Sequence, residues 1–376
     1  MNSKRQFPDE TTLRNHIQTN IDLFVQQTKT AVGPLEAQYK EKSKQQKQGI
    51  ILIVLAFLVL FVVIPALSSF FEATAGLAIF SWLFLLSCLF GAGALGWFAW
   101  KKLQGTTAAI QAFHTALNNF LYPLAFEMFD LKAIRTNQTI KQNKDPEKPA
   151  KETFLAKLTS WAKAAQQSYS SPEEDAVMAL LDHSELITEP RNRVTIDDMV
   201  TATYKERTLA FSELSVKHVT GSGKNRQTKH IFHGYFVSFE LERSLTGKTF
   251  VSTEGDKSGF AHQSFFTTKK NEGLEQTELE WNDFEDLLHV VTNDPTEARY
   301  ILTPDFMLDL HDWWLNQTQN IRLSFLDNKM YMLFPDTEIR IGKTVKQIDR
   351  EQMQAYLESI GIPLLHALHL IEDIQQ

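Results

Sequence analysis

The sequence predicts an α+β protein in which a two-helix transmembrane hairpin with amphipathic flanking helices precedes a cytoplasmic mixed α+β domain with a largely antiparallel sheet. Three observations predict it: two long apolar runs, apolar residues at helical spacing beside them, and alternating apolar and polar residues after about residue 195. The length of 376 residues is typical of two or three folding units. We expect a helical N-terminal segment (1–48), the hairpin (49–102), a helical stalk (103–140), a polar linker (141–152) and the α+β domain (153–376).

Composition excludes several classes of protein. The net charge of -7 argues against a dedicated nucleic-acid binder, which needs a concentrated basic face to contact phosphates. A single cysteine, Cys88, excludes both a disulfide framework and a zinc site built from thiolates. We therefore expect no nucleic acid among the partners.

The predicted hairpin consists of two apolar runs, at about 50–67 and 76–100. About 20 apolar residues in a helix span the hydrocarbon core of a bilayer. The only ionised residue between Gly49 and Trp100 is Glu72, in the expected loop. Lysines flank the outer ends of both runs, so the positive-inside bias places both termini in the cytoplasm. We expect a multi-pass membrane protein, with the lipid bilayer as a partner.

Small residues in the second run form a face that suits close helix packing. Ser87 and Gly91 lie four residues apart, and so do Cys88, Ala92 and Gly96 in turn. The segment from Gly91 to Gly96 also reads G-x-G-x-x-G, the dinucleotide-binding pattern, but no strand precedes it. We expect helix packing, either within the hairpin or between the protomers of a homo-oligomer.

The segments beside the apolar runs carry helical patterns. Apolar residues recur at steps of three and four from Ile17 to Leu35 and from Ile110 to Leu131. Since a hairpin returns the chain to its starting side, these helices can meet as a short antiparallel stalk, interrupted or kinked at Pro34 and Pro123. The linker at 141–152 is polar, contains two prolines and has no apolar periodicity.

The last domain is expected to begin with helices around 154–165 and 177–181, and strand patterns follow from about residue 195. Mostly apolar side chains at odd positions from Ile231 to Leu241 predict a half-buried strand, and further strands are expected near 201–219, 249–253, 262–267 and 286–292. Strands that are grouped between helices favour an α+β fold over a doubly wound one.

Three further patterns predict where helices and turns begin. Asp294 and Glu297 fit a capping box, Thr303 precedes a proline at another helix start, and Asp327-Asn328 fits the turn of a hairpin. Two terminal helices, at about 349–360 and 363–374, are expected to be separated by a break at Gly361.

Candidate chemistry in the sequence is sparse. Two Gly-Lys pairs, at 223–224 and 247–248, lack the glycine five residues earlier that a Walker A phosphate loop needs. His366, His369 and Glu372 have helical spacing that metal ligands can use, but we expect them on the solvated side of the last helix. We expect no metal, no cofactor and no catalytic residue, so an enzyme is the less favoured class.

Three stretches carry a resemblance to a known family: residues 230–236 (HIFHGYF), 245–251 (LTGKTFV) and 291–304 (VTNDPTEARYILTP). They resemble the bacterial family catalogued as domain of unknown function 3137, over roughly Phe113 to Ile374. The resemblance implies two early membrane helices followed by a cytoplasmic domain, with a bacterial inner membrane as the expected location. It implies no activity, cofactor or site residue. The residues also have a structural interpretation, in which Gly234 and Gly247 suit a close backbone approach and a turn, and Asp294 and Thr303 cap helices.

Two residues are candidates for contact with a ligand or partner, Arg299 and His233. The guanidinium of Arg299 can either pair within the molecule or receive an anionic ligand. The leading hypothesis is a membrane-tethered cytoplasmic interaction or regulatory module that binds a protein partner or a small ligand. The alternatives are a membrane-associated enzyme whose site assembles only in the tertiary structure and, with less support, an accessory subunit of a transport complex. A pocket that gathers Arg299, His233 and carboxylates would favour the enzyme.

Overall fold

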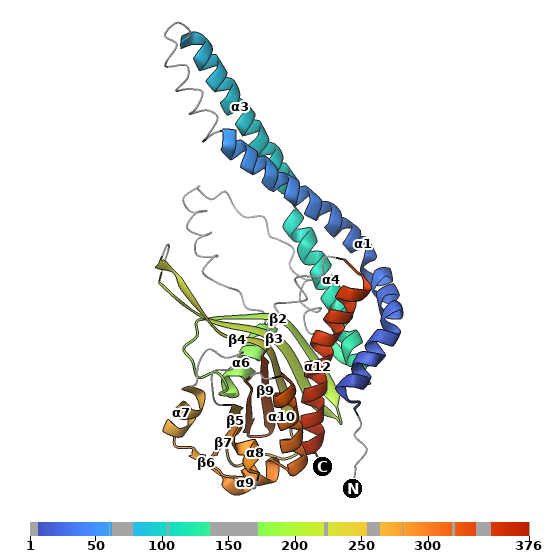
Figure 1. The fold of residues 1–376 in the computed structure, drawn as a ribbon, viewed down its shortest axis with the longest axis vertical. Coiled ribbons are helices and arrows are strands. Elements are labelled where there is room, and N and C mark those ends of the chain that lie inside the picture. Colours follow the sequence, from blue (N-terminus) through green and yellow to red (C-terminus); the bar gives the residue numbers. More distant parts are fainter. Residues whose placement is uncertain are drawn as a thin grey trace, which may run out of the picture. The chain divides into compact units, whose positions relative to one another are not determined.

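The computed structural model describes residues 7–59, 61, 78–103, 105–135, 172–221, 225–253, 264–279, 281–317, 320–335 and 347–375. The predicted linker at 141–152 lies outside these residues. The chain divides into two units. The first comprises Met1–Gln18, Tyr122–Arg340 and Tyr356–Gln376, and it contains the sheet (Figure 1). The second comprises Thr19–Leu121 and Ile341–Ala355, and its described residues are helical almost throughout.

The sheet of the first unit has nine strands among the described residues, in the order β1-β2-β3-β4-β9-β8-β5-β7-β6. Every neighbouring pair is antiparallel. The strands are β1 (Ala133–Arg135), β2 (Arg193–Tyr204), β3 (Arg207–Thr220), β4 (Gln227–Glu240), β5 (Thr249–Thr253), β6 (Glu275–Gln276), β7 (Leu288–Thr292), β8 (Arg322–Leu326) and β9 (Lys329–Pro335). The fold of this unit is therefore α+β with an antiparallel sheet.

Helices cover both faces of this sheet. On one face, α6 (Pro172–His183) and α7 (Ser264–Asn271) contribute to a core that includes Phe232, Phe236 and Phe250. On the other face, α10 (Pro304–Gln317) places Phe306 against Phe325 and Trp313 against Phe334. Strand β4 is consequently buried along most of its second half, and even its polar Ser238 is only 6% exposed. The expectation of a half-buried strand there is wrong because alternation reports only one covered face.

Three elements differ from the sequence prediction. The strand expected near 201–219 is a hairpin that turns at Lys205 and Glu206, both with positive φ. The segment expected to be a strand at 262–267 forms the start of α7 from Ser264 onward. The expected break at Gly361 is absent, because α12 (Arg350–Ile374) continues through it with Pro363 inside the helix.

Both predicted helix caps are confirmed. The side chain of Asp294 accepts hydrogen bonds from the backbone N–H groups of Thr296 and Glu297 at the start of α9 (Pro295–Ile301). The hydroxyl of Thr303 accepts one from Phe306 N, at 3.3 Å, at the start of α10. The short helix α8 (Asn282–Glu285) precedes β7. The hairpin predicted at Asp327-Asn328 joins β8 to β9.

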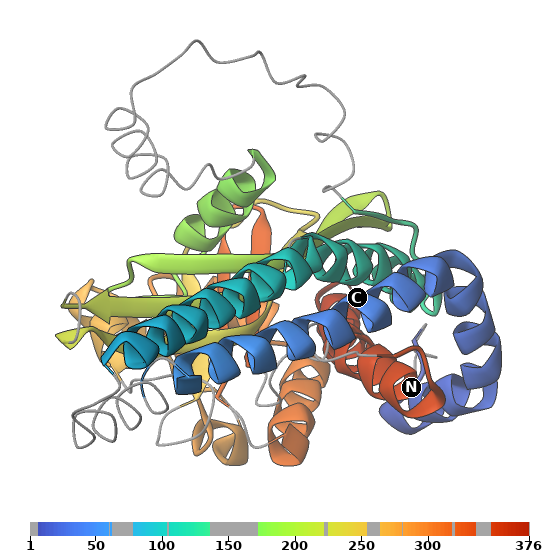
Figure 2. The same ribbon diagram turned by 90° about the horizontal axis from the view of Figure 1, so that it is seen from above.

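The second unit is built from α3 (Ala78–Leu103) and parts of α1 (Glu10–Leu58), α4 (Thr106–Glu127) and α12. Helices α1 and α3 lie side by side (Figure 2), and Lys102 donates a hydrogen bond to Gln48 at 2.6 Å. The ring of Tyr39 stacks on that of Phe113, with centroids 4.7 Å apart, so α1 also contacts α4. Large apolar side chains are exposed on both α1 and α3, including Phe57 and Trp97.

The predicted transmembrane hairpin is wrong for the residues described. None of their helices combines the length and the apolar composition that crossing a bilayer requires. The first apolar run does not begin a helix of its own, because Ile50–Leu58 form the end of the 49-residue helix α1, most of which is polar. The expected loop around Glu72 lies outside the described residues. This finding also contradicts the multi-pass inner-membrane location that was inferred from the hairpin.

Candidate functional site

Two stretches that carry the family resemblance lie against each other. The carboxylate of Glu297 accepts hydrogen bonds from the backbone N–H groups of Thr246 (3.1 Å) and Gly247 (2.8 Å). The next backbone amide, that of Lys248, donates to Oδ1 of Asn293 at 2.6 Å. A capping box would direct Glu297 back to the N–H of its own N-cap residue. Here the glutamate instead joins α9 to the loop that precedes β5.

Glycine is required at position 247 by the lack of space. A Cβ atom there would lie 2.7 Å from Cβ of Asp294 and 2.9 Å from Oδ1 of Asn293. Separations below about 3 Å are repulsive for carbon atoms, whose contact optimum is about 3.5–4.0 Å. The absence of a side chain at this position therefore lets the loop approach the side chains at the start of α9.

The loop at 241–248 is held at its first residue and again from Leu245 onward. At its start, Leu241 N donates to the carbonyl of Asn328 at 2.7 Å, and Leu245 N donates to the carbonyl of Asp327. At its end, Gly247 and Lys248 are bound as described above. The two ends of the loop are thus fixed by the β8–β9 turn on one side and by α9 on the other.

The loop and α9 together present an exposed group of Arg243, Arg299 and Tyr300, which we call the Tyr300 surface. Tyr300 is 66% exposed, and the guanidinium carbon of Arg243 lies 3.8 Å from the centroid of its ring. This distance is within the range of a cation–π interaction. Arg299 is exposed on the same short helix and donates a hydrogen bond to the carbonyl of Glu278 at 3.3 Å.

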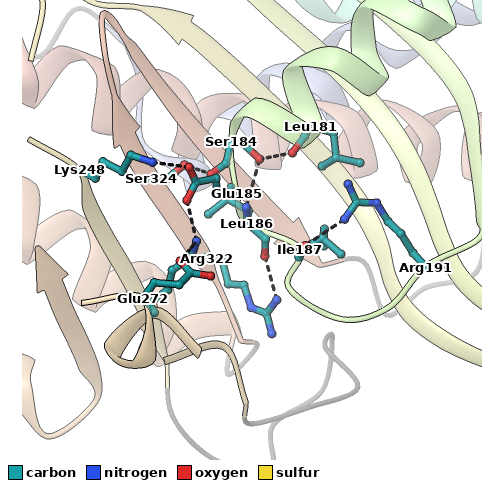
Figure 3. A network of polar contacts seen from close by, with 11 residues as sticks. Leu181, Ser184, Glu185, Leu186, Ile187, Arg191, Lys248, Glu272, Arg322 and Ser324 are labelled. Carbon is teal, nitrogen blue, oxygen red and sulfur yellow. Dashed lines mark hydrogen bonds and ion pairs between the residues drawn. The ribbon is translucent and has the colours of Figure 1, made fainter. Parts of the chain in front are cut away.

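The side chain of Lys248 extends from the loop into a network of ions (Figure 3). Its Nζ lies 2.6 Å from Oε1 of Glu185, and Nζ of Lys269 lies 2.8 Å from the other carboxylate oxygen. Lys269 is only 2% exposed and also contacts Glu272 at 3.0 Å. Burial alone would raise the pKa of Glu185, but hydrogen bonds from the two lysines outweigh it and hold this pKa below its usual range.

A buried ion pair lies beside this network. Arg322 and Glu189 form a bidentate contact with distances of 2.6 and 3.0 Å, and both side chains are almost completely buried. The guanidinium also donates to the carbonyl of Leu186 at 2.8 Å (Figure 3). Since each charge in the two clusters is bound by a charge of opposite sign, this arrangement fixes the segment after α6.

The structure does not bring the two sequence-predicted candidates together. His233 lies in β4, half-buried and opposite Ser215 of β3. Arg299 follows β7, and the strands β9, β8 and β5 lie between β4 and β7 in the sheet. At about 4.8 Å per strand, these elements are on the order of 19 Å apart. A role for either residue in binding stays a prediction.

The histidines of α12 are not on a solvated side, so that expectation is wrong. His369 is 8% exposed and Glu372 is 6% exposed, because α12 packs against other elements around most of its circumference. Nε2 of His369 lies 2.9 Å from the carbonyl of Pro8, and Nε2 of His366 lies 3.4 Å from Oε2 of Glu10. The described residues contain no group of three or more side chains that could hold a metal ion.

The residues predicted to form a helix-packing face lie on α3. A Cβ at Gly91 or at Gly96 would meet nothing within 4 Å, and the side chains of Ser87, Cys88 and Ala92 lie outside the description. The close approach of α1 and α3 is at Gly49, where a Cβ would lie 3.2 Å from Cγ of Leu103. Packing through the predicted face stays a prediction.

Sequence patterns did not identify the buried cations Lys269 and Arg322. Lys269 follows a segment that was expected to be a strand and is a helix. Arg322 occupies the polar position between Ile321 and Leu323, which alternation assigns to a solvated face, whereas both faces of β8 are covered. Only the position of their partners could have identified them, and Glu189 is far from Arg322 in sequence.

Comparison with known proteins gives a family match over the C-terminal part of the chain. The model of a family described as "Protein of unknown function (DUF3137)" matches residues 230–375, so the predicted resemblance is confirmed for that part of the chain. The match contains the 241–248 loop and α9, and it begins later than the expected residue 113. No curated protein matches the chain.

One solved structure shows a weak similarity. The crystal structure of the mycobacterial trehalose monomycolate transport factor A, TtfA, aligns with a TM-score of 0.26 and 10% sequence identity, covering 53% of this chain and 92% of that chain. A similarity at this level supports neither a shared fold nor a shared role.

Proposed function

We propose that the α+β unit is an interaction or regulatory module that binds a protein partner through the Tyr300 surface. The observation that carries this proposal is the exposed ring of Tyr300 stacked on the guanidinium of Arg243. Tyrosine and arginine are the residue types most enriched, together with tryptophan, among those that dominate the energy of protein interfaces.

The rigid support of this surface also favours binding. A loop that must be ordered on association lowers the affinity, because immobilising side chains and backbone costs free energy. The 241–248 loop is ordered in advance by Glu297, Asn293 and the β8–β9 turn. A partner that contacts Arg243 would therefore meet a loop whose two ends are already in place.

The enzyme hypothesis receives less support from the same geometry. It needs Arg299, His233 and several carboxylates in one cleft, and three strands lie between the elements that carry the first two. The nearby ionic groups, Glu185 and Lys269, are engaged with each other. Recognition of a partner needs no such convergence.

Site-specific photocrosslinking tests the proposal. A photoreactive phenylalanine analogue at position 300 of the full chain, in cells that produce the protein, is expected to give a defined protein adduct. The matched control carries the analogue at Leu308, which is exposed on α10 and lies outside the Tyr300 surface. Replacing Arg243 and Arg299 by alanine should lower the adduct yield at least roughly fivefold, the loss expected for interface anchors. Equal adducts at both positions, or a yield that the two alanines leave unchanged, would refute the proposal.

A further inference from the structure

The two arginines of the Tyr300 surface differ from most other arginines of the chain in their partners. The guanidinium of Arg243 contacts the ring of Tyr300, and Arg299 donates to the carbonyl of Glu278, which is a neutral group. None of the carboxylates that the structure describes forms an ion pair with either arginine. By contrast, ion pairs with carboxylates are formed by Arg14, Arg191, Arg207, Arg322 and Arg350.

The acids nearest to these arginines in the chain are directed to other groups. Glu242 precedes Arg243, but its carboxylate lies 3.8 Å from the guanidinium of Arg207. Glu297 lies two residues before Arg299, and its carboxylate accepts hydrogen bonds from two backbone amides of the 241–248 loop. Within the described chain, the Tyr300 surface therefore presents two positive charges without a counterion.

The contact with Tyr300 leaves the hydrogen-bonding edge of Arg243 available. The guanidinium carbon lies 3.8 Å from the ring centroid, which is close to the contact distance of about 3.5–4.0 Å between carbon atoms. The face of the guanidinium therefore lies on the ring, because a group that pointed an N–H at the ring would hold its carbon farther away. The five N–H donors lie in the guanidinium plane and remain free to bind an acceptor.

The position of both side chains is restricted before any partner binds. Ordering a long side chain costs conformational entropy, and this cost lowers affinity. Contact with Tyr300 restricts Arg243, and the hydrogen bond to the carbonyl of Glu278 restricts Arg299. Because the guanidinium fork matches the two oxygens of a carboxylate or a phosphate, an anionic group is the acceptor that fits these arginines.

The surroundings of the two arginines favour the carboxylates of a protein over a nucleic acid. Glu242, beside Arg243, is exposed. Glu278, whose carbonyl Arg299 contacts, is exposed as well. A nucleic acid carries a charge at every nucleotide, so these acids would repel part of a long polyanion. A protein segment can place a carboxylate at each arginine and neutral residues elsewhere.

We infer that the partner presents a short acidic segment to the Tyr300 surface, with one carboxylate bound by Arg243 and another by Arg299. This inference rests on the proposed function, because it names the chemistry of the partner at the same surface. Binding of this kind is electrostatic, and it weakens as salt screens the charges.

Fluorescence anisotropy with the full chain tests the preference for carboxylates. The probe is a short fluorescein-labelled peptide in which glutamate alternates with glycine, and the comparison peptide carries glutamine in place of every glutamate. We expect saturable binding of the glutamate peptide that weakens as the salt concentration rises from about 50 mM to about 200 mM. The glutamine peptide should bind at least roughly tenfold more weakly, because it offers no charged acceptor. Equal binding of the two peptides would overturn the inference.

Single substitutions locate the binding site. Arg243→Gln and Arg299→Gln should each weaken binding of the glutamate peptide roughly fivefold. The matched control is Arg226→Gln, which removes the same charge from an exposed arginine that precedes β4 and should leave the affinity unchanged. Equal losses in Arg243→Gln and Arg226→Gln would overturn the inference, because binding would then depend only on net charge. Circular dichroism of each variant verifies that the fold is retained.

A phosphorylated peptide tests the choice between the two anionic groups. A phosphoserine–glycine peptide of the same net charge should bind no more tightly than the glutamate peptide. Tighter binding of the phosphoserine peptide, or of a single-stranded oligonucleotide of equal charge, would overturn the assignment of the partner as an acidic protein segment.

The photocrosslinked adduct at position 300 separates this inference from the proposed function. Added glutamate peptide should lower the adduct yield, whereas the glutamine peptide should not. An adduct that both peptides leave unchanged would overturn the acidic segment and leave the binding of a protein partner in place. The absence of a defined adduct would instead refute the proposed function, and the inference with it.

Discussion

A single methyl group at residue 247 is expected to disturb the contact between the 241–248 loop and α9. The variant Gly247→Ala would place Cβ 2.7 Å from Cβ of Asp294, so the loop or the helix would have to move. Overpacking of this kind destabilises a protein by about 1–3 kcal/mol. Urea denaturation monitored by circular dichroism would measure the loss in the free energy of unfolding.

The control for this prediction is another glycine of the same unit. At Gly361, within α12, a Cβ would meet Leu13 and Met128 at 3.5 Å, which is ordinary contact. Because alanine is about 0.5–1 kcal/mol more favourable than glycine inside a helix, Gly361→Ala should be neutral or stabilising. Similar destabilisation by both substitutions would contradict the steric explanation.

Single residues of the site were predictable where the signal is local. The caps at Asp294 and Thr303 follow from residue type and immediate neighbours. The role of Glu297 was not predictable, because a glutamate at the third helical position satisfies a local capping pattern equally well. Its actual partners, Thr246 and Gly247, are neighbours only in space.

At the scale of an element, the start of α9 depends on one side chain. Asp294 satisfies two backbone N–H groups that have no partner within the helix. Asp294→Ala should destabilise the protein by about 1 kcal/mol, as loss of an N-cap generally does. Asp294→Asn retains an acceptor oxygen and should recover most of that loss in the same thermal or urea denaturation experiment. An asparagine variant as unstable as the alanine variant would show that the charge matters more than the cap.

The buried pair of Arg322 and Glu189 joins strand β8 to the segment after α6, and we expect the stability of the protein to depend on it. Arg322→Met leaves the carboxylate of Glu189 buried without its cation, and breaking such a pair costs about 3–5 kcal/mol. The double variant Arg322→Met/Glu189→Leu removes both charges and should be less destabilised than Arg322→Met alone. Urea denaturation of the three proteins measures this difference, and a double variant that is less stable than the single variant would contradict the prediction.

Elements were predictable when their boundaries are signalled by capping or turn residues. The hairpin at Asp327-Asn328 and the helices after Asp294 and Thr303 follow such signals. The turn at Lys205-Glu206 was missed because neither residue is glycine or asparagine, the usual residues at positive φ. The continuation of α12 through Pro363 was missed because tertiary contacts outweighed the local breaker.

At the scale of the whole molecule, stability at low pH should depend on Glu10. The hydrogen bond from His366, opposed by burial and assisted by Arg14, lowers the pKa of Glu10 from 4.5 to about 2. A carboxyl whose pKa is lowered in the folded state stabilises the protein above its unfolded pKa, and this contribution is lost as the pH falls through the folded value. The Glu10 contribution should therefore disappear between about pH 4.5 and about pH 2.

Glu10→Gln tests this dependence. The decrease in the free energy of unfolding from about pH 6 to about pH 3 should be smaller in this variant than in the unmodified protein. Asp312→Asn, which alters an exposed carboxyl of the same unit, serves as the control. Its free energy of unfolding should decrease over this pH range as much as that of the unmodified protein does. An identical decrease in Glu10→Gln and the unmodified protein would contradict the assignment.

The order of the strands in the sheet was the feature of the fold least predictable from the sequence. The strand order places β9 beside β4 and β5 beside β8, and no local pattern specifies such pairings. The transmembrane hairpin was predicted from composition, and the helices described do not support it, because the first apolar run belongs to a much longer, mostly polar helix. Apolar composition indicates that a segment avoids water, and it does not specify the partner that covers it.

The contact between Gly247 and Asp294 has a consequence for evolutionary variation. Because the two positions share one small volume, a relative that carries any larger residue at 247 must carry a compensating change at 294 or a displaced helix. Substitutions at these two positions should therefore occur jointly among related sequences. The acid at 297 should likewise be lost only where the amides of 246 and 247 gain another acceptor.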